Sequence, residues 1–155
     1  MLQKLAHFAA VFAGGIITGG QYVVSFDYST ADVSASFYTE KMQYAIHHIG
    51  TPLFGMLITA TLLSIAAAVL NRTEKRIFYL LVGAAGCFLA GGLITKFGNI
   101  PLLDAIDTWS VSSPPANWRQ IAERWYLFHT IRIIVDFVGF FLALLSVFAR
   151  RPNLN

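Results

Sequence analysis

Residues 125–149, WYLFHTIRIIVDFVGFFLALLSVFA, decide the fold of this chain. The stretch is apolar apart from a few residues in its first half, and it exceeds the roughly 20 residues that an α-helix needs to cross a hydrocarbon core about 30 Å thick. Three further apolar runs precede it, at about residues 5–26, 49–70 and 77–96. The sequence therefore predicts an all-α protein, a membrane-embedded four-helix bundle that forms one integral membrane domain over residues 1–155.

The composition agrees with this prediction. Hydrophobic residues make up 56% of the chain and charged residues only 12%, which is about half of the charged fraction of a soluble domain. The net charge of +3 does not indicate a nucleic-acid partner, because the cationic residues lie mainly at the ends of the apolar runs. Cys87 is the only cysteine, so an intramolecular disulfide, a CxxC redox centre and a thiolate zinc site are excluded.

The basic residues that flank the runs predict how the chain is oriented. These residues are Lys4, Arg72, Lys75, Arg76, Arg150 and Arg151. Cytoplasmic loops carry the excess of Lys and Arg in membrane proteins. We therefore expect a multi-pass protein of the cell (inner) membrane, with the lipid bilayer around it and both termini in the cytoplasm. The longer connections, about residues 27–48 and 96–124, would then face outward.

The second of these outer connections carries a helical pattern of its own. Pro101 fits the first turn of a helix, with Asn99 near its cap. Leu102, Ile106 and Trp109 then recur at helical spacing. The pattern predicts a short amphipathic interfacial helix between the third and fourth spans.

Small residues mark faces on which helices pack closely. Gly15 and Gly19 form a GxxxG pair in the first run, while Gly83, Cys87 and Gly91 repeat every four residues in the third. This spacing lets helix backbones approach each other in lipid. It predicts packing within the bundle, and the alternative is assembly into a homo-oligomer or a larger membrane complex through the glycine faces.

One face of the fourth run carries its unusual residues. Trp125, His129, Arg132 and Asp136 are spaced 4, 3 and 4 residues apart, so they share a helix face. An unpaired charge at this depth costs at least about 2.5 kcal/mol. The face should therefore point into the bundle, with Arg132 as the partner of Asp136. Both a buried structural ion pair and a binding-site cation positioned by its carboxylate fit the pattern.

Other polar residues reach the same outer end of the bundle. They are Gln43, Tyr44, His47 and His48 before the second span, Lys96, Asn99 and Asp104 after the third, and Asp27 and Tyr28 after the first. Polar groups gathered at one end predict a pocket under an amphipathic flap and not a route across the membrane. His47 and His129 are candidate ligands for a metal ion or a haem, but tight ligand spacings are absent, so no cofactor is predicted.

The chain resembles a known family in the segment after the third span. The stretch Phe97-Gly98-Asn99-Ile100-Pro101-Leu102 is followed by Trp109, Trp118, Arg124-Trp125, His129 and Arg132, and Met42-Gln43 with Ile46 precedes the second span. This pattern resembles the anthrone oxygenase-like family of small four-helix membrane proteins, most sharply over residues 97–132. Relatives usually have Asn where this chain has Leu103, and often have Asn at the positions of His47 and His129.

The resemblance implies an oxygenase that converts a polyketide anthrone into an anthraquinone with molecular oxygen and no evident cofactor. His129 or His47 would remove the substrate's proton, and Arg132 would stabilise the resulting enolate oxyanion. The predicted substrate-binding residues are Asn99, Gln43, His48, Asp104, Trp109, Trp125 and Asp136. The leading hypothesis is an integral membrane oxidoreductase for a small hydrophobic or aromatic ligand. The alternatives are a non-catalytic membrane subunit of a larger complex and a haem or metal electron-transfer protein.

Overall fold

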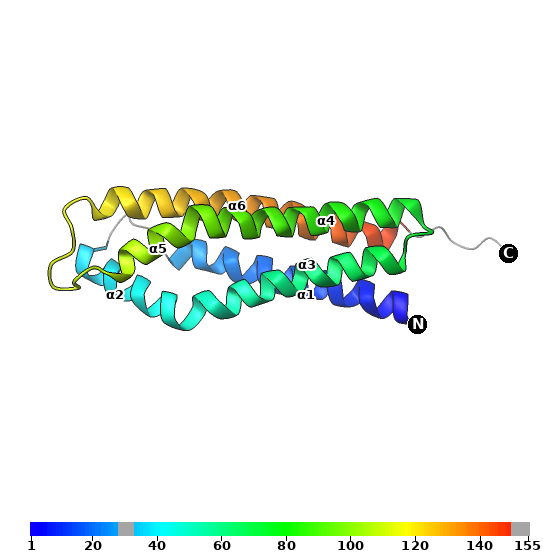
Figure 1. The fold of residues 1–155 in the computed structure, drawn as a ribbon, viewed down its shortest axis with the longest axis horizontal. Helices are drawn as coiled ribbons and strands as arrows, with labels where there is room; N and C mark the ends of the chain where they lie inside the picture. Colours follow the sequence, from blue (N-terminus) through cyan, green and yellow to red (C-terminus); the bar gives the residue numbers. More distant parts are fainter. Residues whose placement is uncertain (28–32, 150–155) are drawn as a thin grey trace.

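Four long helices form an elongated bundle in the computed structural model of the chain (Figure 1). Residues 1–27 and 33–149 are described. Tyr28, Arg150 and Arg151, which entered the sequence predictions, lie outside the described residues. The described part contains helices and connections but no β-sheet, and each long helix is apolar enough to cross a membrane. The predicted all-α four-helix bundle is confirmed.

Two of the four long helices contain a π-helical turn, in which the backbone bonds run from residue i to i+5. The elements are α1 (Leu2–Asp27), α2 (Ala35–Ala45), η1 (Ile46–Gly50), α3 (Thr51–Leu70), α4 (Lys75–Ile94), η2 (Thr95–Asn99), α5 (Ile100–Asp107) and α6 (Trp118–Phe148). α2, η1 and α3 follow one another without a break, and so do α4, η2 and α5. The π-helical turns η1 and η2 thus join a membrane-length helix to a shorter one.

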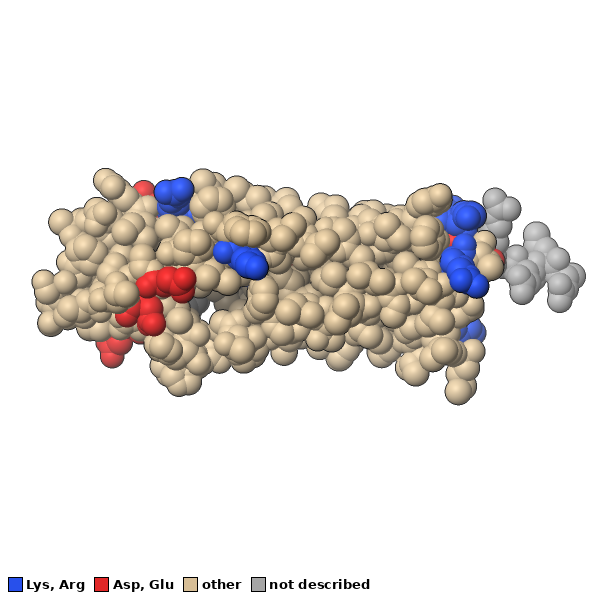
Figure 2. Space-filling model, viewed as in Figure 1, with Lys and Arg blue, Asp and Glu red and all other residues tan. Residues whose placement is uncertain are grey.

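The outside of the bundle is apolar along its middle. Outward-facing side chains there include Phe12, Leu62 and Phe141, which are 58–60% exposed. Figure 2 shows that charged side chains gather toward the two ends of the molecule and leave an uncharged band between them. An apolar surface of this extent is stable in lipid and not in water. The chain is therefore a multi-pass membrane protein.

The second span begins earlier than the sequence predicts. The apolar run suggests a start near residue 49, whereas α2 and η1 carry the helix back to Ala35. Ser34 caps this helix, because its Oγ accepts a hydrogen bond from the backbone N–H of Phe37 at 3.2 Å. The helical part that precedes the apolar run is polar, so hydropathy alone does not detect it.

The predicted interfacial helix is present as α5, but it continues α4 through η2 and is not a separate element. Asn99 does not cap it. Its backbone is helical and its Nδ2 donates instead to the carbonyl of Trp125 on α6, at 3.1 Å. Asn99 therefore ties η2 to α6.

The small-residue face of the third span packs inside the bundle. α4 lies against α6, and a Cβ added at Gly139 of α6 would stand 2.9 Å from the Cβ of Cys87. A Cβ added at Gly83 would stand 3.1 Å from Leu142, also on α6. Gly83 and Cys87 thus serve the contact between α4 and α6, as expected for packing within the bundle. Association between copies of the chain stays a prediction.

Both termini of the helical bundle lie at the end that carries the α3–α4 turn (Figure 1). Gln3 donates to the carbonyl of Leu70 at 2.8 Å, and His7 hydrogen-bonds Ser146 near the end of α6. The basic residues of the α3–α4 turn therefore share one end with the start of α1. The compartment that this end faces stays a prediction from the positive-inside rule.

Candidate functional site

A cavity of about 300 Å³ lies toward the other end of the bundle, between α1, the α2–η1–α3 helix, the η2–α5 segment and α6. Its wall is mostly apolar and includes Leu53, Phe54 and Trp125. Polar side chains interrupt this wall at a few points, among them Thr95, Asn99, Asp104 and Arg132. Figure 2 shows a hollow in the surface near the acidic side chains of this end. The size is at the lower limit of small-molecule sites, which have few polar groups in apolar walls.

Both π-helical turns line this cavity, through Ile46, Ile49 and Gly50 of η1 and through Thr95 and Asn99 of η2. A proline follows each turn within two residues of its end, because α3 and α5 both have Pro in their first turn. Proline has no N–H to donate to the carbonyl four residues earlier, so the regular ladder is interrupted there. The prolines thus give a local reason for both turns, and π-helical turns often occur at functional sites.

Arg132 is held in the cavity wall by residues from two helices. Its Nε and Nη2 donate to Nδ1 of His129 at 3.2 and 2.8 Å, and its Nη1 donates to Oγ1 of Thr95 at 3.2 Å. Thr95 in turn donates to the carbonyl of Gly91 at 2.9 Å. Arg132 as a whole is only 9% exposed. These bonds fix its position before any ligand is bound.

His129 acts on the cavity through Arg132. The ring is fully buried, does not line the cavity, and stacks on Trp125 with ring centroids 4.8 Å apart. A guanidinium only donates hydrogen bonds, so Nδ1 of His129 must accept, and the neutral ring carries its proton on Nε2. The lone pair that a base would use is therefore occupied in this arrangement.

Asp136 lies one turn beyond Arg132 on α6, but the expected ion pair between them is not formed. The donors of Arg132 go to His129 and Thr95, and neither carboxyl oxygen of Asp136 has a hydrogen-bond partner. The carboxyl group lies against Gly91 of α4, where an added Cβ would stand 2.9 Å from Cγ and Oδ2 and closer still to Oδ1. Helix spacing places both side chains on one face but does not fix which way a long guanidinium turns.

Two other predicted residues reach the cavity with Arg132 and Trp125. Asn99 is 1% exposed, and while its Nδ2 bonds the carbonyl of Trp125, its Oδ1 has no partner. Asp104 of α5 is exposed and belongs to the cavity lining. The structure therefore brings together Asn99, Asp104, Trp125 and Arg132, from η2, α5 and α6.

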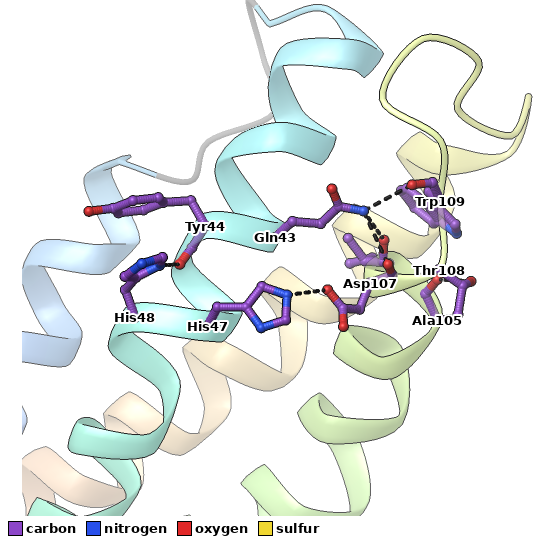
Figure 3. Close-up of polar contacts among 9 residues, drawn as sticks. Gln43, Tyr44, His47, His48, Ala105, Asp107, Thr108 and Trp109 are labelled. Atoms are coloured by element: carbon purple, nitrogen blue, oxygen red, sulfur yellow. Dashed lines mark hydrogen bonds and ion pairs between the residues drawn. The ribbon is translucent and has the colours of Figure 1, made fainter.

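Gln43 of α2 binds the end of α5 instead of the cavity (Figure 3). Its Nε2 donates to the carbonyls of Ile106, Asp107 and Trp109 at 3.2, 3.2 and 2.9 Å. The last carbonyls of a helix have no partner within the helix. Gln43 supplies that partner and joins α2 to α5.

His47 faces α5 as well, so its predicted grouping with His129 and Arg132 is wrong. Its Nε2 lies 3.0 Å from Oδ1 of Asp107, and its side chain is 61% exposed (Figure 3). Gln43 and His47 do share a helix face, as their spacing predicts, but that face lies against α5. Sequence spacing could not decide between these two directions.

His48 and Trp109 also lie away from the cavity. Nδ1 of His48 donates to the carbonyl of Tyr44 at 2.9 Å, and the two rings stack with centroids 4.2 Å apart on an exposed face (Figure 3). Trp109 packs into an apolar cluster with Met42 and Ile106 between α2 and α5. Neither residue is in the cavity lining.

Comparison with known proteins places the chain in a family. A family model described as anthrone oxygenase matches residues 44–142, which is more than half of the chain. The chain belongs to the anthrone oxygenase family. No curated protein and no solved structure matches it. Membership suggests an oxygenase or oxidoreductase role, and the matched segment contains Asn99, Asp104, Trp125 and Arg132.

The described residues of this anthrone oxygenase family member do not form a cluster of three His, Cys, Asp or Glu side chains suited to a metal ion. His47 is exposed beside Asp107, whereas His129 is buried beside Arg132. The two imidazoles therefore do not face a common point, as a metal or haem held by this pair would require.

The sequence did not reveal that Thr95 is part of the site. A single threonine at the end of an apolar run is ordinary, and its importance comes from the guanidinium that reaches it from α6. One sequence signal was available for the neighbouring turns. A proline shortly after a membrane-length run, as at Pro52 and Pro101, indicates a break in the helical bonding pattern.

Proposed function

We propose that this member of the anthrone oxygenase family is an integral membrane oxygenase that acts on a small, apolar aromatic molecule with an acidic C–H bond. The observation that carries the proposal is the fixed guanidinium of Arg132 in the wall of an otherwise apolar cavity. Donors held rigidly where negative charge develops are a main source of catalysis, because they need no reorganisation during the reaction.

The chemistry follows from removing one proton. A CH₂ group between two aromatic rings, which conjugate it with a carbonyl group on the opposite side of the central ring, becomes an enolate whose oxygen accepts hydrogen bonds from Arg132. The electron-rich carbon then forms a bond to O₂, and the resulting peroxide loses water. One CH₂ group and one O₂ thus give one C=O group and one H₂O. In this scheme the protein's side chains only bind the substrate, orient it and move protons.

The cavity wall suits an aromatic ring system. Trp125 and Phe54 offer ring faces and Leu53 adds aliphatic surface, and aromatic rings pack favourably on such groups. Asn99 has a free carbonyl oxygen, Oδ1, on a residue that lines the cavity, so a phenolic hydroxyl of the ligand has an acceptor there. We propose that Asn99 and Arg132 together set the orientation of the ligand.

We further propose a cell-membrane location with both termini in the cytoplasm. The support is that Arg72 lies in the turn between α3 and α4 and that Lys75 and Arg76 begin α4, at the end away from the cavity. On this orientation the cavity lies in the outer half of the membrane protein. Labelling of single cysteines introduced at Thr73 or Ser112 in intact cells would test it, because only the outer site should react with an impermeant maleimide.

Oxygen uptake by the purified protein in lipid nanodiscs tests the catalytic proposal, with anthrone as the probe. The wild type should consume one O₂ for each anthraquinone formed, and Arg132→Gln should lower kcat/KM roughly 100-fold or more. Arg124→Gln is the matched control, since Arg124 is an exposed arginine of α6 outside the cavity lining. Full activity in Arg132→Gln would refute the proposed role of this residue.

The same preparation separates the alternatives. A stoichiometric partner protein together with no oxygen uptake would favour a non-catalytic subunit. Bound haem or metal with reversible reduction and no anthraquinone would favour electron transfer.

A further inference from the structure

A group of buried polar atoms without hydrogen-bond partners lies between α1 and α6. The atoms are Thr18 Oγ1, Gln21 Nε2 and Oε1, His129 Nε2, and Asp136 Oδ1 and Oδ2. Each of these side chains is at most 1% exposed. Gln21 connects the group, because its side chain interacts with the carboxyl group of Asp136 and its backbone interacts with the ring of His129. Buried polar groups are nearly always satisfied, so a cluster of exceptions requires an explanation.

The chemistry of these atoms suits a bound water molecule. Gln21 Nε2 and His129 Nε2 carry N–H donors, Asp136 offers two acceptors, and the Thr18 hydroxyl does both. A hard cation such as Ca²⁺ or Mg²⁺ takes oxygen ligands, and the two N–H donors do not suit it. Water accepts and donates at the same time, and a buried water molecule typically makes about three such bonds.

This group of polar atoms adjoins the cavity. Thr95 and Arg132 line the cavity, while Gly91 and Asp136 lie four residues from them on α4 and α6, which is one turn further along each helix. Gly91 makes the approach possible, because any side chain there would overlap the Asp136 carboxyl group. The carboxyl group is therefore within reach of the cavity through one or two bridging molecules.

On the basis of the function proposed above, we propose that Asp136 is the proton acceptor for the carbon acid bound beside Arg132, reached through water held by Thr18, Gln21 and His129. The substrate's C–H bond breaks, its electron pair stays on the substrate as the enolate, and the proton bonds to a carboxylate oxygen of Asp136. After O₂ adds at carbon, the proton returns to the peroxide oxygen, and loss of water leaves the ketone.

Charge conservation favours this acceptor. Before transfer the buried groups are the cation of Arg132 and the anion of Asp136. After transfer they are the same cation and the enolate, so the net buried charge does not change. If the proton left the protein instead, two buried anions, the enolate and the Asp136 carboxylate, would lie beside the one cation of Arg132. Such an excess of buried charge is costly in a medium of low dielectric constant.

The other titratable groups near Asp136 are poorly placed for this role. Nδ1 of His129 is engaged by Arg132. Cys87 of α4 is near enough to Asp136 to interact with it electrostatically, but its Cβ packs against Gly139. Asp104 is the rival, because it lines the cavity itself, although it is exposed. A decisive experiment must therefore tell Asp136 from Asp104.

Infrared difference spectroscopy on the protein in nanodiscs makes this distinction. The probe is a hydroxyanthraquinone, whose visible absorption changes when its hydroxyl group ionises. In the wild type the bound dye should be the anion, and the carbonyl band of one protonated carboxyl group should appear in step with it. Isotopic labelling of aspartate should shift that band. This readout needs no variant, so it stands even where a substitution prevents folding.

Variants then assign the band. Asp136→Asn, which keeps the shape of the side chain, should show no band and turn over anthrone at least 100-fold more slowly. Asp104→Asn should keep both the band and the dye anion. Glu123→Gln, at an exposed position of α6 outside the cavity lining, is the matched carboxyl control.

Two results would overturn the assignment of Asp136. One is the absence of a carboxyl band in the wild type. The other is normal turnover of anthrone in Asp136→Asn, which leaves the oxygenase proposal intact. Conversely, a wild type that ionises the dye with the Asp136 band but does not oxidise anthrone would support the acceptor and refute the oxygenase.

Discussion

Replacing Gly91 with alanine should destabilise the bundle because of one contact. The added Cβ would lie 2.9 Å from Cγ and Oδ2 of Asp136, and closer to Oδ1. Real Cβ atoms do not approach other heavy atoms so closely, and the Asp136 side chain is fully buried. Overpacking of this kind costs about 1–3 kcal/mol.

The matched control is Gly86→Ala on the same helix. Nothing lies within 4 Å of a Cβ added at Gly86. Both variants gain helix propensity of up to about 1 kcal/mol, so that gain cancels in the comparison. The difference between them should equal the cost of the clash, about 1–3 kcal/mol, which corresponds to roughly 2–12 °C in Tm for a chain of this size.

Thermal unfolding in one detergent, followed by tryptophan fluorescence, measures this difference. The double variant Gly91→Ala/Asp136→Ala provides the internal check, since removing the carboxyl group removes the atoms that the new methyl group meets. The penalty of Gly91→Ala should therefore nearly vanish in the Asp136→Ala background. Equal melting temperatures for Gly91→Ala and Gly86→Ala would refute the placement of Asp136 against α4.

The remaining predictions concern the contacts around the cavity. Gln43→Ala should lower the free energy of unfolding by about 1 kcal/mol or more, because it leaves several carbonyls of α5 without their donor, and hydrogen exchange at the end of α5 should rise. His47→Ala removes only an exposed pair with Asp107 and should change stability by less than about 1 kcal/mol; a larger loss than in Gln43→Ala would contradict this order. Thr95→Val keeps the volume but removes an acceptor of Arg132, and it should cost about 1–3 kcal/mol in chemical unfolding, whereas wild-type stability would show that this bond contributes nothing.

Hydropathy and helical spacing were sufficient for the framework of this protein. Each of the four apolar runs is a helix, and the spacing of Trp125, His129, Arg132 and Asp136 correctly predicted one buried face. These features depend on local periodicity. A helix face with charged residues must also point into the bundle, because lipid does not solvate charged side chains.

The directions of individual side chains were not predictable in this way. Arg132 is long enough to reach either Asp136 or His129, and the choice is made by Thr95, which comes from another helix. The same holds for His47, whose partner Asp107 lies sixty residues further along the chain. Contacts between distant segments depend on the packed structure, and a helix pattern carries no information about them.

The length of α3 and α4 has a consequence for how such a protein would meet its ligand. Each helix has 20 residues and therefore spans about 30 Å, the thickness of the hydrocarbon layer. At its cavity-side end, each is joined to a π-helical turn. The π-helical turns that line the cavity then lie at the depth of the lipid carbonyl groups. An apolar ring system would partition into the leaflet first and reach the cavity by lateral diffusion. Saturation of the cavity should therefore depend on the mole fraction of the ligand in the lipid and not on its concentration in the buffer.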